Sequence, residues 1–84
     1  MTAYRIVWTL AADGQLRALD PMIRRRIASK VDALARDPFR YLTRLVNSPY
    51  YRLRVGDFRV IVAVEAQIVT IVVLQVVHRR NAHR

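Results

Sequence analysis

The sequence contains no cysteine, and glycine, proline, histidine and acidic residues are all scarce. Without cysteine the chain can form neither disulfide bonds nor a thiolate zinc site. Its only histidines, His78 and His83, are too few to complete a structural metal site alone. Repeats, low-complexity tracts and linkers are also missing. We therefore expect one folded unit that binds no metal and no other cofactor.

Long apolar runs are missing as well. The longest run extends from Ile68 to Val77, is interrupted by two polar residues, and reaches about half of the ~20 residues that a helix needs to span a bilayer. Polar and charged residues appear early, at Thr2 and Arg5, and no secretory cleavage pattern follows them. We therefore expect a cytoplasmic protein without a membrane segment.

What the chain does have is apolar residues and arginine. Its 84 residues are 54% hydrophobic, enough for one folded domain covering residues 1–84 and too many for a disordered basic tail. Fifteen cations face six acids, and all of the cations except Lys30 are arginine. A net charge of +9 favours a polyanionic partner such as nucleic acid, an anionic membrane or an acidic protein. Arginine adds forked contacts with phosphate or carboxylate.

The pattern of apolar residues predicts an α+β domain in which an antiparallel sheet packs on an N-terminal helical hairpin, in the order β-α-α-β-β-β. A first strand is expected at residues 4–8 and a short helix after it. Asp20 and Pro21 are typical of a helix start, and we expect the second helix to run from Met22 to Arg36. Residues 38–49 are irregular. The three remaining strands are expected at residues 50–55, 58–64 and 68–77.

Gly56 and Asp57 form a two-residue link between the second and third strands, as a type II′ hairpin turn requires. That turn pairs Arg54 with Arg59, so two guanidinium groups lie directly opposite each other. Like charges in this arrangement destabilise a sheet by a few tenths to about 1 kcal/mol. The pair therefore suggests an anion nearby.

With Arg52, which shares a strand face with Arg54 and Tyr50, the pair would form a cationic patch that can hold a phosphodiester. Such a patch can also stabilise the extra negative charge of a phosphoryl-transfer transition state. Tyr50 is a candidate for stacking on a base. The alternative is a solvated sheet face whose arginines splay apart.

A second basic cluster follows the last strand, and its residues are His78, Arg79, Arg80, His83 and Arg84. A histidine can pass protons near neutral pH, and the arginines can bind RNA phosphates. The alternative is a frayed basic tail at the end of the chain.

At this point the sequence resembles the RelE/ParE toxin superfamily, and the RelE branch more than the ParE branch. The specific block is the segment from Tyr51 to Ile61, YRLRVGDFRVI, which is similar to the family's aromatic, basic-x-basic, Gly-Asp-aromatic-Arg strand pair. Weaker similarity lies in residues 19–31, the family's second helix, and in residues 76–80, its closing strand.

The resemblance implies the toxin of a type II toxin–antitoxin system, a metal-independent endoribonuclease that cleaves messenger RNA in the ribosomal A site by attack of the 2′-OH. Carried over from the family, Arg59 and Arg79 would clamp the phosphate, and Arg52 or Arg54 would position RNA. The expected partners are the ribosome, messenger RNA and a cognate antitoxin. An acidic, amphipathic segment of that antitoxin would cover the cationic face in a hetero-oligomer.

Two departures from the family pattern leave alternatives open. Val77 stands where the family usually has glycine, and no tyrosine follows Tyr51, although the family commonly has one near its end. His83 is the nearest candidate to replace that tyrosine. One alternative is a ParE-like inhibitor of DNA gyrase, and the other is a catalytically degenerate module that binds RNA or antitoxin.

Overall fold

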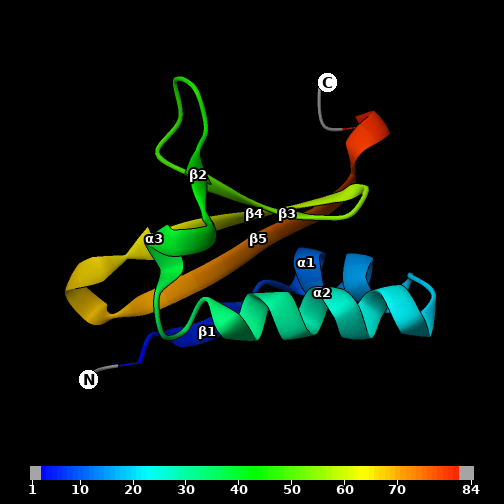
Figure 1. Ribbon diagram of the computed structural model, residues 1–84, viewed down its shortest axis with the longest axis horizontal. Helices are drawn as coiled ribbons and strands as arrows, with labels where there is room; N and C mark the ends of the chain where they lie inside the picture. The colour runs from blue at the N-terminus through cyan, green and yellow to red at the C-terminus, as the bar shows by residue number, and fades with distance from the viewer. Residues whose placement is uncertain (1–2, 82–84) are drawn as a thin grey trace.

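The computed structural model describes residues 3–81, in which two helices lie against one face of a five-stranded sheet (Figure 1). The helices are α1 (Leu10–Arg17), α2 (Pro21–Ala33) and the single-turn α3 (Pro38–Tyr41). The strands are β1 (Arg5–Trp8), β2 (Thr43–Arg44), β3 (Tyr51–Val55), β4 (Phe58–Glu65) and β5 (Thr70–His78). The 3-10 helices η1 (Ala66–Ile68) and η2 (Arg79–Asn81) follow β4 and β5.

The sheet has the strand order β1-β5-β4-β3-β2. Its β2, β3, β4 and β5 pair antiparallel, whereas β1 pairs parallel with β5 from Arg5↔Thr70 to Trp8↔Val73. The predicted α+β class is therefore confirmed, but the sheet is mixed and not wholly antiparallel. The parallel pairing places the first strand beside the apolar last strand, which would otherwise form an open edge.

Helix α2 begins as the sequence predicted and ends earlier. The Asp20 carboxylate accepts a hydrogen bond from the Met22 N–H at 3.1 Å, and Pro21 occupies the first helical position. Ile27 and Val31 are fully buried on the stripe that faces the sheet. The helix ends at Ala33, three residues before the predicted end at Arg36.

In the described residues no helix has the length and apolar character needed to cross a membrane.

The segment predicted to be irregular contains α3 and the two-residue strand β2. The Phe39 ring meets the Tyr51 ring edge-on, with 5.5 Å between their centroids. Leu42, which directly follows α3, packs against the core. These contacts hold β2 at the edge of the sheet beside β3.

The hydrophobic core lies between the helices and one face of the sheet. Ala12, Ile27 and Val31 are fully buried on the helices, and Leu34, which directly follows α2, is also fully buried. The buried residues on the sheet side are Leu53, Val55, Val60, Val62, Ile71, Val73 and Val76. Because side chains alternate along a strand, the residues between these positions lie on the opposite face, which α1 and α2 leave uncovered (Figure 1).

Strand β5 carries a bulge at Leu74. Ile61 pairs with Gln75 but the next residue, Val62, pairs with Val73, so Leu74 has no partner across the ladder. The bulge reverses which residues face the core: Val73 faces it before the bulge and Val76 after it. The position of every later side chain in the strand depends on this one extra residue.

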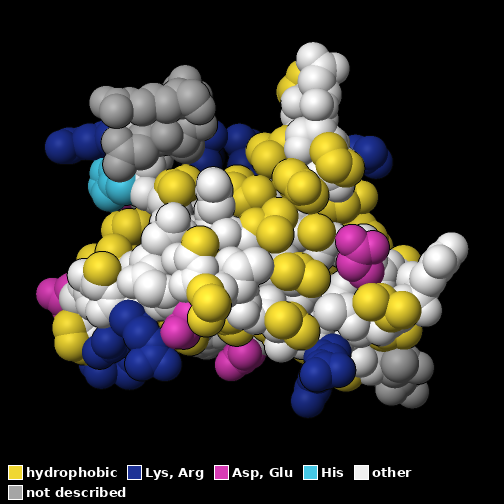
Figure 2. All heavy atoms as spheres, turned by 180° about the vertical axis from the view of Figure 1, so that it is seen from behind, with side chains coloured by type: hydrophobic (Ala, Val, Ile, Leu, Met, Phe, Trp, Pro, Cys, Tyr) yellow, Lys and Arg dark blue, Asp and Glu magenta, His cyan; other side chains and the backbone are white. Residues whose placement is uncertain are grey.

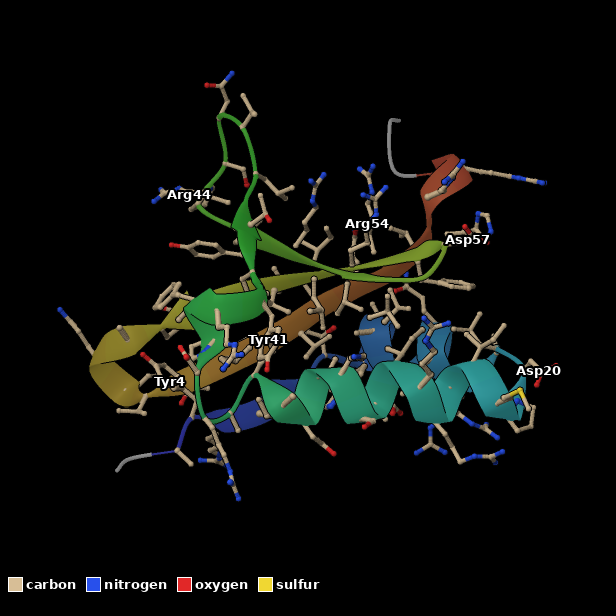
Figure 3. The ribbon with its side chains drawn as sticks, in the orientation of Figure 1. Tyr4, Asp20, Tyr41, Arg44, Arg54 and Asp57 are labelled. Atoms are coloured by element: carbon tan, nitrogen blue, oxygen red, sulfur yellow. The ribbon has the colours of Figure 1, made fainter. Side chains whose placement is uncertain are left out.

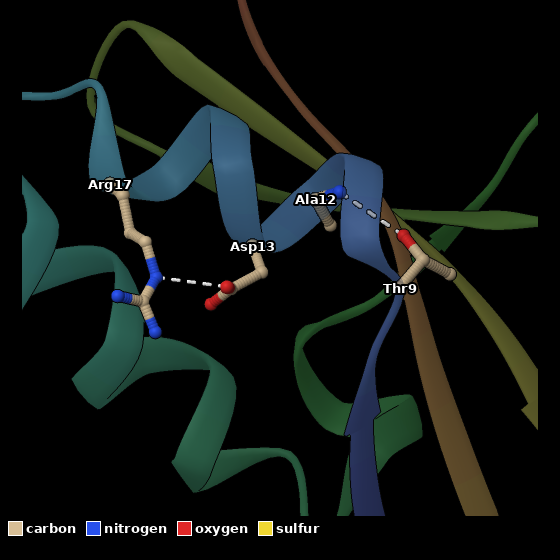
Figure 4. A network of polar contacts seen from close by, with 4 residues as sticks. All are labelled: Thr9, Ala12, Asp13 and Arg17. Carbon is tan, nitrogen blue, oxygen red and sulfur yellow. Dashed lines mark hydrogen bonds and ion pairs between the residues drawn. The ribbon is translucent and has the colours of Figure 1, made fainter.

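Helix α1 supplies hydrogen bonds to the bulged part of β5. The Thr9 hydroxyl donates a hydrogen bond to the Leu74 carbonyl at 3.2 Å. The same hydroxyl accepts from the Ala12 N–H and so caps the helix (Figure 4). An ion pair between Asp13 and Arg17 lies one turn further along the same helix (Figure 4). The Gln15 side-chain oxygen accepts from the Val76 N–H at 2.7 Å. Strand β1 ends at Trp8 and therefore offers no backbone partners to Leu74 and Val76. The side chains of Thr9 and Gln15 supply these hydrogen bonds instead.

Replacing Gln15 by alanine is expected to lower the free energy of unfolding by about 1–3 kcal/mol, because the N–H of the buried Val76 loses its acceptor. Urea denaturation followed by circular dichroism would measure the change. Gln67→Ala is the matched control, since Gln67 is exposed and should change stability by no more than about 0.5 kcal/mol. Equal effects of the two substitutions would contradict this role for Gln15.

Candidate functional site: an arginine-lined depression

The β3–β4 hairpin has the register that the sequence predicted. Val55 pairs with Phe58, Arg54 with Arg59 and Leu53 with Val60 across the turn at Gly56 and Asp57. Gly56 has a φ of +57°, and no other residue of the turn has a positive φ, which agrees with the expected type II′ conformation. The two arginines therefore face each other on the uncovered face of the sheet. Figure 3 shows Arg54 pointing away from α1 and α2.

The uncovered face is hollowed beside this pair. The depression has a volume of about 430 Å³ and is lined by four arginines, namely Arg54, Arg59, Arg79 and Arg80. The first two come from the hairpin, and the other two from η2, which follows β5. A backbone hydrogen bond of 2.7 Å from the Arg79 N–H to the Asp57 carbonyl holds η2 against the hairpin turn. The structure thus brings two arginines of each basic cluster together at this depression.

Carboxylates are nearly absent from this depression. The single ion pair there, between Arg79 and Asp57, is 3.9 Å long and exposed on both sides, so it is a weak contact in water. In the part of the chain that the structure describes, Arg54, Arg59 and Arg80 have no carboxylate within salt-bridge distance. Figure 2 shows basic side chains without acidic ones along the upper edge of the molecule, and both basic and acidic side chains on the lower part of the same face. The site is therefore strongly positive and open to an external anion.

Arg59 is the most enclosed of the four arginines. Its Nε atom is buried from solvent and has no hydrogen-bond acceptor among the described residues. Val77 lies directly opposite Arg59 in the ladder, at the position where glycine was expected. A buried N–H without an acceptor is costly and calls for a partner.

Two predicted site residues lie outside the depression. Arg52 is on the same strand face as Arg54 but does not line the depression. It pairs with Ile61, two residue pairs further from the hairpin turn. Tyr50 precedes β3 and is 41% exposed, and it does not line the depression either. The roles of Arg52 in positioning RNA and of Tyr50 in stacking stay predictions.

His78 lies on the other face of the sheet. It pairs with Phe58, and the two rings meet edge-on with 5.1 Å between their centroids. Paired residues share a face, and Phe58 packs against the core, so His78 lies on the helix side while Arg59 lies on the uncovered side. His78 therefore does not line the depression with the arginines, and its predicted role in binding RNA stays a prediction. The bulge at Leu74 is the physical reason, because it reverses the alternation along β5.

The remaining predicted residues divide into two groups. Arg80, predicted to bind RNA phosphate, lines the depression together with Arg54, Arg59 and Arg79. His83 and Arg84 lie outside the described residues, and their roles stay predictions. Reasoning from the sequence missed Asp57 as a site residue; its carbonyl and carboxylate both contact Arg79. The hairpin turn alone accounts for an aspartate at position 57, so nothing else in the sequence marked Asp57 as a site residue.

The chemistry available in the depression follows from its four guanidinium groups. They donate hydrogen bonds to anionic oxygens and keep their charge at neutral pH. No three His, Cys, Asp or Glu side chains in residues 3–81 are grouped so that they could hold a metal ion. The arrangement suits binding of a phosphodiester and stabilisation of added negative charge on it.

Comparisons with known proteins agree with this geometry. The family model described as ParE toxin of type II toxin-antitoxin system, parDE, matches residues 6–83. No curated protein matches. Among solved structures, the toxin–antitoxin complex RelBE2 from Mycobacterium tuberculosis contains a chain that is 26% identical, with a TM-score of 0.82, covering 92% of this chain and 99% of that one.

Two further structures extend the comparison. The archaeal RelE–RelB complex from Pyrococcus horikoshii contains a chain that is 28% identical to this one, with a TM-score of 0.81. The match covers 98% of this chain and 100% of that chain. The YoeB/ParE toxin from Agrobacterium tumefaciens, at 19% identity, a TM-score of 0.71 and coverage of 88% and 96%, shows the shared fold alone. The chain therefore belongs to the ParE/RelE superfamily of toxins of type II toxin–antitoxin systems.

Proposed function

We propose that this toxin is an endoribonuclease that cleaves messenger RNA in the A site of the ribosome by in-line attack of a 2′-OH on its own phosphate. The proposal rests on the depression, which is lined by four arginines that form almost no ion pairs with carboxylates of the described residues. Cleavage breaks the bond to the 5′-oxygen of the next nucleotide and leaves a 2′,3′-cyclic phosphate. The reacting phosphorus passes through a state with more negative charge than the substrate.

Each arginine has a place in this reaction. Arg59 and Arg79 reach the depression from β4 and η2, and they would clamp the non-bridging oxygens of the phosphate. Arg54, opposite Arg59, would hold the RNA and favour ionisation of the 2′-OH, and Arg80 would bind a neighbouring phosphate. Guanidinium groups do not accept protons at neutral pH. The 2′-OH proton therefore passes to an acceptor other than these four side chains.

The proposed protein partner is a cognate antitoxin. Relatives have been crystallised as complexes of toxin and antitoxin, including RelBE2 from Mycobacterium tuberculosis. The chain's charge of +9 and its arginine-lined depression favour an acidic, amphipathic antitoxin segment that covers the cationic face. The complex would be a hetero-oligomer.

Induced expression of the toxin is expected to stop growth and to leave breaks in messenger RNA at codons in the ribosomal A site. Primer extension on messenger RNA isolated soon after induction would locate the breaks. Co-expression of the antitoxin is the control and should suppress both effects. Intact messenger RNA in growth-arrested cells would contradict the proposed nuclease.

A second candidate function is inhibition of DNA gyrase, and the match to the ParE family model favours it. The four clustered arginines favour the nuclease instead, because gyrase inhibition needs no phosphoryl chemistry. The same induction experiment separates the two functions. Induction of the DNA damage response with intact messenger RNA would support gyrase inhibition, and ribosome binding without cleavage would support a degenerate module.

A further inference from the structure

The His78 ring is fixed on the helix side of the sheet. It meets the Phe58 ring edge-on at 5.1 Å, and Phe58 in turn packs against the core. Edge-to-face contact at this distance is a favourable geometry for two aromatic rings. The ring therefore has a defined orientation, although it cannot reach the depression on the opposite face.

The Nδ1 atom of His78 accepts a hydrogen bond of 3.2 Å from the Arg80 N–H. A neutral imidazole accepts at one ring nitrogen and carries its proton on the other. The bond therefore requires the tautomer with the proton on Nε2. It joins the last residue of β5 to the second residue of η2, where the chain leaves the sheet.

Two hydrogen bonds from backbone N–H groups hold the start of η2 in place. The Arg79 N–H donates to the Asp57 carbonyl at 2.7 Å, and the next N–H, that of Arg80, donates to His78. Two successive backbone groups are thus anchored, one to the hairpin turn and one to the ring. This fixes the direction in which the Arg80 side chain leaves the backbone, and that side chain lines the depression.

We propose that His78 is a positioning residue, which through its hydrogen bond to the Arg80 backbone aims the Arg80 side chain at RNA phosphate. The inference rests on the proposed function, since it assigns a role within the same RNA-binding site. It replaces the expectation that His78 itself contacts RNA. The chain needs an acceptor at this position and an apolar surface against Phe58, and histidine supplies both.

The first test measures RNA affinity without cleavage, using fluorescence anisotropy of a labelled single-stranded hexaribonucleotide and the purified toxin. His78→Leu keeps an apolar contact with Phe58 but removes the acceptor, and it is expected to raise Kd by about two- to tenfold, the range for loss of one hydrogen bond. His78→Asn places an amide oxygen near the Nδ1 position and is expected to restore affinity to within about twofold.

The second test is a double-mutant cycle with Arg80→Ala. If His78 acts through Arg80, His78→Leu should change Kd by less than about twofold once the Arg80 side chain is gone. An equal loss of affinity in both backgrounds would show a general structural effect and overturn the proposal. RNA binding that is unaffected by His78→Leu would also overturn it while leaving the proposed function intact.

A third measurement does not depend on any variant folding correctly. Nitrogen-15 NMR of the wild-type toxin distinguishes the imidazole tautomers, and the proton is expected on Nε2 of His78. A proton on Nδ1 would exclude the hydrogen bond and overturn the proposal. A wild-type toxin that binds no hexaribonucleotide in the first test would overturn the role of His78 in RNA binding, whereas the proposed nuclease is overturned only by the absence of A-site breaks after induction.

Discussion

Replacing Arg59 and Arg79 together by alanine is expected to lower the rate of ribosome-dependent RNA cleavage by at least about 10³-fold. Each residue contributes a preorganised donor to the phosphate, and removal of one such donor costs about 10² to 10³ in kcat. Single-turnover cleavage of messenger RNA on programmed ribosomes would measure the rate. In cells, the double variant should cause neither growth arrest nor A-site breaks.

The matched control is Arg24→Ala combined with Arg36→Ala, which removes the same charge from outside the depression. Thermal unfolding separates loss of activity from loss of fold. Removing Arg59 relieves the repulsion with Arg54, so the double catalytic variant should be no less stable and could gain up to about 1 kcal/mol. A stable double variant that still cleaves would show that catalysis resides elsewhere.

Binding of single-stranded RNA is expected to weaken roughly 50-fold between about 50 and 200 mM salt, with a slope of about −3 in a plot of log affinity against log salt concentration. The reason is release of counterions as the four arginines of the depression each neutralise a phosphate. Fluorescence anisotropy across a salt series would give the slope.

The slope also reports on each arginine separately. Arg80→Ala should make it shallower by about 0.7, the contribution of one phosphate contact, whereas Arg36→Ala should leave it unchanged. A slope close to zero in the wild-type toxin would mean that the arginines do not contact phosphates. Affinity would then arise from stacking or hydrogen bonding alone.

The hairpin and its charged pair could be predicted from local sequence. A two-residue link with glycine first specifies both the turn and the register, and the register places Arg54 opposite Arg59. The start of α2 was equally predictable, because Asp20 and Pro21 act within one helical turn. In both cases the determining residues are neighbours in the chain.

Features that depend on distant contacts could not be predicted in this way. The parallel pairing of β1 with β5 joins residues about 65 positions apart, and nothing in either strand specifies the direction of its partner. The bulge at Leu74 is stabilised by Thr9 and Gln15 from another element, so the apolar run itself gives no sign of it. The sheet face on which His78 lies depends on this bulge, and the position of Arg80 depends on the path of η2, so neither could be predicted locally.

Half of the positive charge in the depression is attached to η2, beyond the final strand, and the other half to the hairpin. Neither Arg79 nor Arg80 belongs to the hydrophobic core. A binding partner that displaced η2 from the hairpin turn would therefore remove Arg79 and Arg80 at once without opening the core. Such inactivation would be reversible, because the unchanged sheet would serve as a template on which the same short segment could reattach.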